Sequence, residues 1–285
     1  MTPATPTALF VSPHLDDAAF SATRTMLALA KRGWRVVMAT ALTQSVAVPK
    51  GFALRCQTDK GIDPDVDYMA VRRDEDHAFI RELSRGLSEQ RGADDIDATL
   101  GTICNRFGDL PEAPHRGYES AAELFSRVRD DDALGRQLDE FFIRLVIELE
   151  PSLCFGPLGY GRHVDHVQVI RSLDRVMPAS VRRAYYRDTP YVLRADPGQS
   201  IVGHASMNAY RIGATESDKR LQCDAIAKYE TQLPFQFGGV DAMRRTMKEA
   251  IEILYSPCPE PVLGDLVGDE QSAKRTLMNP QITSA

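Results

Sequence analysis

Short apolar runs alternate with longer amphipathic stretches along the first part of the chain. Residues 8–12 form an apolar run that stops at Pro13, a pattern typical of a buried strand. Residues 17–31 place apolar side chains on one helical face, and residues 34–43 form a second apolar run. This strand–helix–strand order predicts a parallel sheet with a right-handed crossover.

The alternation continues through the rest of the sequence. We expect further helices at residues 70–87, 119–150 with a break around 130–132, 163–177, 219–229 and 241–254, and further strands at 96–103, 152–155, 181–187 and 191–194. Segments 45–68 and 106–118 contain Gly and Pro and no clean period, which indicates long loops of the kind that often serve function. The predicted fold class is α/β, with a mostly parallel sheet flanked by helices. We expect one domain over residues 1–285, with a loosely packed tail at 255–285.

The composition is that of an ordinary globular protein with a slight acidic excess. The 285 residues include 34 basic and 40 acidic side chains, for a net charge of −6, which disfavours nucleic acid or an anionic membrane as a partner. No uncharged stretch reaches the roughly 18 residues of a membrane helix. The first basic residue is Arg24, which argues against a secretory signal. The 5 cysteines are scattered, with no C-x-x-C pair, as in a cytoplasmic protein with reduced thiols.

Two polar segments stand directly after predicted strands. Ser-Pro-His-Leu-Asp-Asp occupies residues 12–17, and Gly-Tyr-Gly-Arg-His-Val-Asp-His occupies residues 159–166. In an open parallel sheet, ligands bind beyond the carboxyl ends of the strands, near a point where the strand order reverses. If the two strands are neighbours, their histidines and carboxylates converge on one crevice.

The residue types in these segments fit a catalytic metal centre. Such a centre commonly takes three protein ligands from His and Asp or Glu and leaves one position open. His14 and Asp17 are three residues apart on a turn into a helix, and His166 completes a set of two histidines and one carboxylate. His163 lies one helical turn before His166, on the same side of its helix.

The neighbouring polar residues could supply the remaining chemistry. Asp16 could take a proton from water that the metal acidifies. His163 could stabilise the oxyanion of a tetrahedral intermediate or protonate a leaving amine, and Asp165 could hold His163 in the required tautomer. Taken singly, each segment is also compatible with a capped helix start or a solvated turn. Their joint placement at two strand ends favours a site.

At these residues the sequence resembles the LmbE-like/PIG-L family of metal-dependent de-N-acetylases, whose signatures are His-Pro-Asp-Asp-Glu and His-Pro-Asp-His. The resemblance implies a Rossmann-like fold and removal of N-acetyl groups from amino-sugar conjugates, usually with one zinc ion per chain. It also implies that His14, Asp17 and His166 ligate the metal, that Asp16 is the general base and that His163 stabilises the oxyanion.

The resemblance covers about residues 8–240, with weaker likenesses at 72–78, 110–117, 185–191 and 228–232. Leu15 and Val164 stand where the family usually has proline, and Ala18 stands where it has glutamate. None of these departures removes an expected ligand or base. The missing glutamate predicts that the first helical turn is supported differently.

Four further residues are candidates for substrate binding. Arg72 could contact substrate or pair with a carboxylate on its own helix, and Arg116 could clamp a hydroxyl or phosphate or lie in solvent. Asp188 follows a predicted strand and could bind sugar hydroxyls or cap a turn. Tyr160 lies one residue from the place where some family members hold a mobile tyrosine over the substrate carbonyl, and simple packing is the alternative.

Together these features predict a zinc-dependent amide hydrolase that removes an N-acetyl group from an amino sugar or related conjugate. Fe²⁺ could occupy the same ligands. One alternative is a glycosyltransferase or a protein that binds glycans or nucleotide sugars and holds Mg²⁺ or Mn²⁺ on Asp16 and Asp17, although such ions seldom need histidines. Another is an amidase for a larger acyl group or a thiol-sugar conjugate. The expected partner is a small molecule, the expected location is the cytoplasm, and a homo-oligomer remains open.

Overall fold

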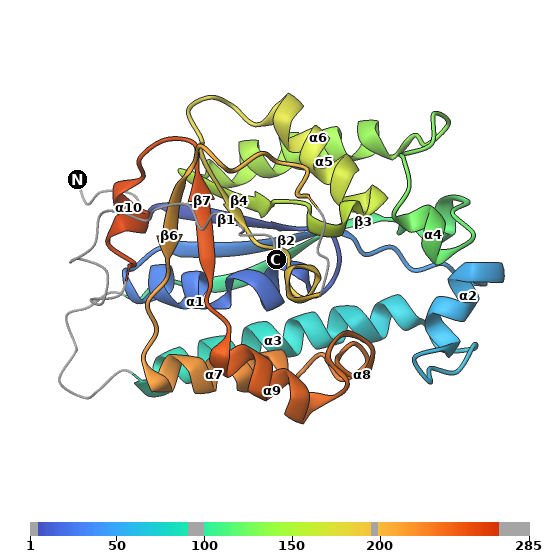
Figure 1. The fold of residues 1–285 in the computed structure, drawn as a ribbon, viewed down its shortest axis with the longest axis horizontal. Helices are drawn as coiled ribbons and strands as arrows, with labels where there is room; N and C mark the ends of the chain where they lie inside the picture. The colour runs from blue at the N-terminus through green and yellow to red at the C-terminus, as the bar shows by residue number, and fades with distance from the viewer. Residues whose placement is uncertain (1–4, 91–99, 195–198, 268–285) are drawn as a thin grey trace, which may run out of the picture.

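A seven-stranded sheet with the order β3-β2-β1-β4-β5-β7-β6 forms the centre of the computed structural model (Figure 1). The structure describes residues 5–90, 100–194 and 199–267. The strands are β1 (Thr7–Ser12), β2 (Arg35–Leu42), β3 (Ile103–Leu110), β4 (Leu153–Pro157), β5 (Arg182–Tyr186), β6 (Asn208–Arg211) and β7 (Ile253–Ser256). Strands β1 to β5 pair in parallel, whereas β7 runs antiparallel to both β5 and β6. The predicted α/β class with a mostly parallel sheet is confirmed.

Helices cover both faces of this sheet. They are α1 (Asp17–Lys31), α2 (Gly51–Thr58), α3 (Tyr68–Gln90), α4 (Ala121–Leu124), α5 (Leu134–Leu149), α6 (Val164–Val176), α7 (Glu216–Ile226), α8 (Leu233–Phe237), α9 (Val240–Glu249) and α10 (Pro261–Gly264). Figure 1 shows α5 and α6 on one side of the sheet, and α1, α3, α7 and α9 on the other. Within the described ranges, no helix combines the length and the apolar run that a membrane crossing requires.

The two helical layers enclose two apolar cores, one on each face of the sheet. In the first core, Phe10 of β1 stacks on Phe155 of β4 with ring centroids 4.2 Å apart, among side chains of α1, α3 and α7. The second core packs Leu9 and Val11 of β1 against Phe142 of α5 and Val169 of α6. Because β1 is buried on both faces, it is a continuous apolar run rather than an alternating one.

The order of the strands places a switch point between β1 and β4. From β1 the chain adds β2 and then β3 on one side, and it later returns to add β4 and β5 on the other. Strands β1 and β4 are direct neighbours, with Leu9 opposite Cys154. The segments that follow these two strands therefore meet at one edge of the sheet, as the sequence predicted.

Several element predictions were wrong. The third strand was expected at 96–103, but residues 91–99 lie outside the described part, and β3 occupies Ile103–Leu110, partly within the expected loop 106–118. Among the described residues, this strand pairs with β2 alone and forms one edge of the sheet. An edge strand needs no continuous apolar run, so its polar residues did not predict a strand. The expected strand 191–194 is a 3₁₀ turn, η3 (Tyr191–Leu193). The helical stretch 119–150 is interrupted between α4 and α5, and this interruption includes residues 130–132, where a break was expected.

The C-terminal region is better packed than expected. The predicted helix 241–254 ends at Glu249, and the chain continues into β7 inside the sheet. Beyond it, Leu263 and Leu266 are buried in the first core, because they cover apolar side chains at the β6 and β7 end of the sheet. The expectation of a loose tail is wrong for residues 255–267, and the rest of that tail lies outside the described residues.

Candidate active site

Hydrogen bonds within the loop after β1 hold His14 and Asp17 close to each other. The Ser12 hydroxyl donates to the His14 carbonyl at 2.6 Å and accepts from the Ala18 backbone N–H at 2.9 Å. The backbone N–H of His14 donates to Asp17 Oδ2 at 2.8 Å. The first turn of α1 is thus supported by Ser12, in place of the glutamate that is usual in the family at position 18.

The loop after β4 turns sharply before α6 begins. Gly159 has a φ of 80°, and a Cβ at this position would lie 2.5 Å from Ile201, so glycine is required there. The N–H groups of Gly159 and Tyr160 donate to Asp188 Oδ2 at 2.8 and 3.2 Å. His163 caps α6, since its Nδ1 accepts from the Asp165 backbone N–H at 3.2 Å.

The two loops bring the three expected metal ligands together. Ligand atoms of His14, Asp17 and His166 all lie within 4.8 Å of one another. Asp17 Oδ2 is 3.1 Å from His14 Nδ1 and 3.2 Å from His166 Nε2. His166 Nε2 is buried and makes no hydrogen bond with any described residue. Two imidazole nitrogens and one carboxylate oxygen that converge in this way, one of the nitrogens buried without a hydrogen bond, fit a divalent transition-metal ion.

Each of the two histidines has a second carboxylate on its other ring nitrogen. Asp165 Oδ2 lies 2.9 Å from His14 Nε2, and Asp188 Oδ1 lies 2.9 Å from His166 Nδ1. Both carboxylates are fully buried. Burial alone would lower the pKa of His166, but Asp17 and Asp188 together more than compensate and raise it to about 9. Carboxylates in this position fix the tautomer and orientation of histidines that bind metal.

Asp16 lies beside the ligand set but is turned away from it. Its carboxylate is 3.7 Å from the guanidinium of Arg72, which also pairs with Glu112 at 2.5 Å. Burial and the neighbouring Asp17 raise the pKa of Asp16 to about 7, although Arg72 opposes the shift. A carboxyl group with a pKa near neutrality is suited to accept a proton.

His163 lies across the site from Asp16, with its ring 4.9 Å from the His14 ring. Burial lowers the pKa of His163 to about 3, so the ring is neutral. Because Nδ1 accepts the Asp165 N–H, the ring proton is on Nε2, which is left to donate. The sequence expected the Asp165 carboxylate to fix this tautomer. That carboxylate is instead 3.8 Å away, bound to His14, and the backbone of Asp165 acts on His163.

The four residues expected to bind substrate have different surroundings. Arg72 lines the pocket described below, although it is 4% exposed. Arg116 is used within the protein, because it donates to Asp132, to the Pro111 carbonyl and to Asp165 Oδ1 at 2.6 Å. Its contacts position Asp165 and oppose the expected clamp on substrate.

Asp188 and Tyr160 also lie away from the pocket. Asp188 has no exposed surface, and its oxygens bind His166 and the backbone of the β4–α6 loop, which argues against the expected contact with sugar hydroxyls. The Tyr160 hydroxyl lies 3.3 Å from His204 Nε2, and Tyr160 does not line the pocket. A role over the substrate carbonyl does not follow from this geometry.

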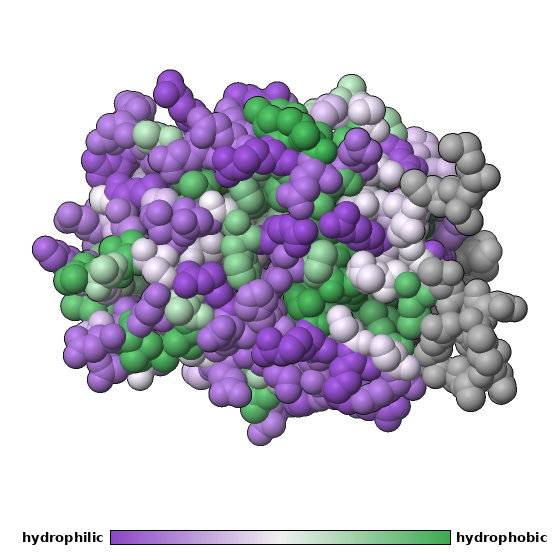
Figure 2. Space-filling view, turned by 180° about the vertical axis from the view of Figure 1, so that it is seen from behind, coloured by the Kyte–Doolittle hydropathy of each residue, from purple (hydrophilic) through white to green (hydrophobic). Residues whose placement is uncertain are grey.

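A pocket of about 390 Å³ opens above the ligand set. His14, Asp16, Asp17 and His163 form part of its lining. Its walls come from α2, α4 and α8 and include apolar rings and two cations that the sequence analysis missed: Phe52, Phe125, Tyr191, Phe235, Lys60 and Arg194. Figure 2 shows apolar residues among polar ones at the end of the molecule that carries α2 and α4. Both long loops expected from the sequence, 45–68 and 106–118, contribute to these walls.

Glu112 is a further site residue that the sequence analysis did not name. It lines the pocket and pairs with Arg72. Burial alone would raise the pKa of Glu112, but the charges of Arg72, His14 and Lys60 together hold it below its usual range. A signal was present, because Glu112 lies within the 110–117 stretch that resembles the family.

Comparison with known proteins points to deacetylases. No protein-family model matches the chain. A 2'-N-acetylparomamine deacetylase of Streptomyces fradiae is 28% identical over 190 residues, which cover 66% of this chain and 58% of that protein. The chain thus matches less than two thirds of the length of this relative.

Solved structures share the fold. The A40926 pseudoaglycone deacetylase has a TM-score of 0.67 and 20% identity, with 89% of this chain and 98% of that chain covered. A zinc-inhibited teicoplanin deacetylase has a TM-score of 0.67 and 19% identity, with coverage of 87% and 97%. The similarity in sequence to one deacetylase and the fold shared with others bear out the likeness of the two motifs: this chain resembles the LmbE-like/PIG-L de-N-acetylases in both sequence and fold.

Proposed function

We propose that the protein is a metal-dependent amide hydrolase that removes an N-acetyl group from an amino sugar or a related conjugate. The observation that carries the proposal is the arrangement of His14, Asp17 and His166 around one point at the pocket floor, with Asp16 and His163 beside it. The names of the similar proteins support the same reaction, since they are deacetylases of sugar-containing or antibiotic compounds.

The bound metal would act as a Lewis acid that polarises the acetyl carbonyl and acidifies water. Zinc is the ion that this ligand set fits best, with Fe²⁺ as the second choice. The protein residues supply the proton transfers and the charge stabilisation. Asp16 accepts the proton of the attacking water, and the Nε2–H group of His163 donates to the oxyanion that forms on the carbonyl.

The pocket walls support a substrate larger than a free monosaccharide. Exposed rings of Phe125 and Phe235 lie on the rim, where an apolar part of a conjugate could pack. Lys60 and Arg194 lie on the same walls and could bind hydroxyl, carboxylate or phosphate groups. We therefore propose an N-acetylated conjugate with an apolar or anionic portion beyond the sugar.

A screen of N-acetylated amino sugars and their conjugates tests the proposal. Released primary amine is detected by fluorescence, with metal-loaded protein, with chelator and with metal restored. We expect amine release that the chelator abolishes and added zinc restores. Chelator-insensitive turnover, or turnover that needs magnesium and a nucleotide sugar, would contradict the proposal.

Two variants separate the general base from the metal. Asp16→Asn should keep the metal and lose roughly a hundredfold to ten-thousandfold in kcat, the usual range for a general base. His166→Ala should lose both the metal and the activity. Normal turnover by Asp16→Asn would refute the role of Asp16, whatever the outcome for the metal.

A further inference from the structure

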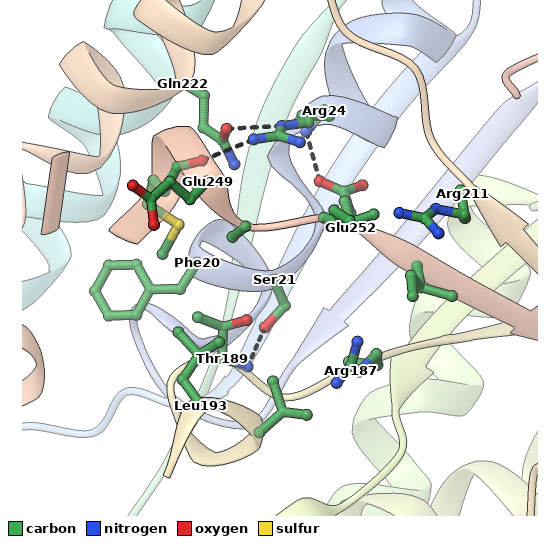
Figure 3. Close-up of a pocket in the computed structure, with 15 residues that line it drawn as sticks. Phe20, Ser21, Arg24, Arg187, Thr189, Leu193, Arg211, Gln222, Glu249 and Glu252 are labelled. Atoms are coloured by element: carbon green, nitrogen blue, oxygen red, sulfur yellow. Dashed lines mark hydrogen bonds between the residues drawn. The ribbon is translucent and has the colours of Figure 1, made fainter. Parts of the chain in front are cut away.

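A second cavity, of about 270 Å³, lies at the end of β5, β7 and β6 (Figure 3). It shares no lining residue with the active-site pocket. The segment that follows β5 separates the two, because Tyr191 lines the active-site pocket while Thr189, Val192 and Leu193 line the second cavity. Nothing in the reaction proposed above uses this cavity.

Two arginines line it from neighbouring strand ends. Arg211 is the last residue of β6 and pairs with Ile253 of β7. Arg187 directly follows Tyr186, which pairs with Leu254 on the other side of β7. Arg187 and Arg211 therefore flank Ile253, with their backbones roughly 10 Å apart, twice the spacing of adjacent strands. Two long side chains at this separation can reach one ligand.

Neither guanidinium has a partner in the described part of the chain. No hydrogen bond or ion pair joins Arg187 or Arg211 to any residue there, although both side chains are partly buried. Arg24, in the same cavity, is different: its Nε donates to Gln222 at 2.9 Å and its Nη2 to the Met247 carbonyl at 2.7 Å. Partly desolvated cations without partners are costly unless an anion binds them.

The acidic residues of the cavity do not neutralise the two arginines. The Glu252 carboxylate accepts from the backbone N–H groups of Arg24 and Thr25, each at 2.9 Å. Glu249 is exposed in the last turn of α9, and Figure 3 shows it on the side of the cavity away from both arginines. The positive charge on the Arg187 and Arg211 side therefore stays available.

The opposite side of the cavity is apolar. Val192 and Leu193 line it there, and Figure 3 shows Leu193 on the side away from Arg211. The volume corresponds to about nine water molecules at roughly 30 Å³ each. We propose that this cavity binds a small organic oxyanion with an apolar body, its charged group held by Arg187 and Arg211 and its apolar part packed on Val192 and Leu193.

Calorimetric titration of the metal-loaded full chain tests this assignment without requiring turnover. Benzoate and phenyl phosphate serve as probes, and benzyl alcohol and inorganic phosphate serve as controls that lack the charge or the ring. We expect saturable binding of one or both aromatic anions, at least tenfold tighter than either control. A tighter benzoate identifies a carboxylate ligand, and a tighter phenyl phosphate identifies a phosphate ester.

Arg187→Gln and Arg211→Gln should each weaken probe binding at least tenfold. Arg194→Gln is the matched control, because it removes a cation from the active-site pocket instead. Binding that depends on Arg194 and not on Arg187 or Arg211 would overturn the proposal, as would the absence of saturable binding. Circular dichroism establishes that the variants are folded.

A measurement on the unmodified protein covers the case in which a variant does not fold. Phenylglyoxal labels accessible arginines, and mass spectrometry locates the labels. The tighter-binding probe should protect Arg187 and Arg211 while leaving Arg194 reactive. Equal labelling of Arg187 and Arg211 with and without the probe would overturn the proposal. Because both readouts measure binding, their failure would leave the proposed deacetylase activity untouched.

Discussion

Replacing Asp188 with asparagine is expected to weaken metal binding without disturbing the fold. Asp188 Oδ1 lies 2.9 Å from His166 Nδ1, and Oδ2 accepts the two N–H groups of Gly159 and Tyr160. In Asp188→Asn, the amide oxygen can keep both backbone hydrogen bonds. The amide N–H₂ group then faces His166 Nδ1 and donates to it. The imidazole must carry its proton on Nε2, the atom that faces Asp17.

The size of the effect follows from this change of tautomer. A proton on Nε2 occupies the lone pair that would bind the cation, so metal binding must first move that proton. Loss of a carboxylate partner behind a ligating histidine typically costs 10-fold to 100-fold in metal affinity, or roughly 1.4 to 2.7 kcal/mol. The carboxylate has no exposed surface, so solvent cannot replace it. We therefore expect the upper part of this range.

Competition with a chromophoric chelator measures the Kd for zinc. Asp76→Asn is the matched control, because Asp76 is an equally buried carboxylate that is neither in the ligand set nor in the pocket lining. Activity of Asp188→Asn should return at saturating zinc. A folded Asp188→Asn with the zinc Kd of the parent would refute the reasoning. If KM rose while the zinc Kd stayed the same, Asp188 would contact substrate, as the sequence first led us to expect.

Three other outcomes follow from the structure. Burial raises the pKa of Asp76 to about 7, so the folded protein keeps a proton on Asp76 that the unfolded chain releases near pH 4. Asp76 should therefore lower the free energy of unfolding by on the order of 4 kcal/mol from pH 4 to pH 8, in addition to the fall that Asp16 contributes through its own raised pKa. In urea titrations Asp76→Asn should reduce the total fall by about that amount, whereas exposed Asp74→Asn should leave it unchanged. Phe142→Ala should lower the free energy of unfolding by about 3 to 5 kcal/mol in the same assay, because Phe142 is fully buried. Ile147→Ala, also on α5, should lower it little, because Ile147 is 72% exposed, and equal losses for the two variants would contradict this packing. Zinc added to the metal-free protein at about 100 times its Kd should raise stability by roughly 2.7 kcal/mol, seen as a higher Tm that chelator reverses; an unchanged Tm would argue against a metal site.

The strands that carry the site could be predicted because each is a short run of buried residues. Strands β1 and β4 were placed within two residues of their observed bounds, and α1 was placed at its observed bounds. A polar segment after a buried strand in a parallel sheet lies at the edge where ligands bind, so chain position alone located His14 and His166. Strand β3 was misplaced because its edge position relaxes the apolar pattern. The antiparallel β7 was missed because only three residues separate it from α9.

The partners of the site residues could not be predicted from spacing. Asp165 lies two residues after His163 and directly before His166, yet its carboxylate binds His14, 151 residues away. The rotation of α6 about its axis decides which neighbour that carboxylate meets, and the sequence does not specify it. Arg116 lies in a segment with Pro and Gly, so the sequence indicated either a solvated arginine or one that binds substrate. It is a structural residue because the chain brings both Asp132 and Asp165 within reach of its guanidinium.

The charge of the site explains why these partnerships matter to function. Four buried carboxylates lie in or beside the ligand set: Asp17 belongs to it, and Asp16, Asp165 and Asp188 lie next to it. Two buried or partly buried arginines, Arg72 and Arg116, pair with Asp16 and Asp165. The acids therefore outnumber the arginines, and the raised pKa values of His14 and His166 show that the site draws positive charge towards itself. A divalent cation supplies that charge while leaving both imidazoles neutral, as ligands must be. The same cluster would thus favour folding with a bound metal.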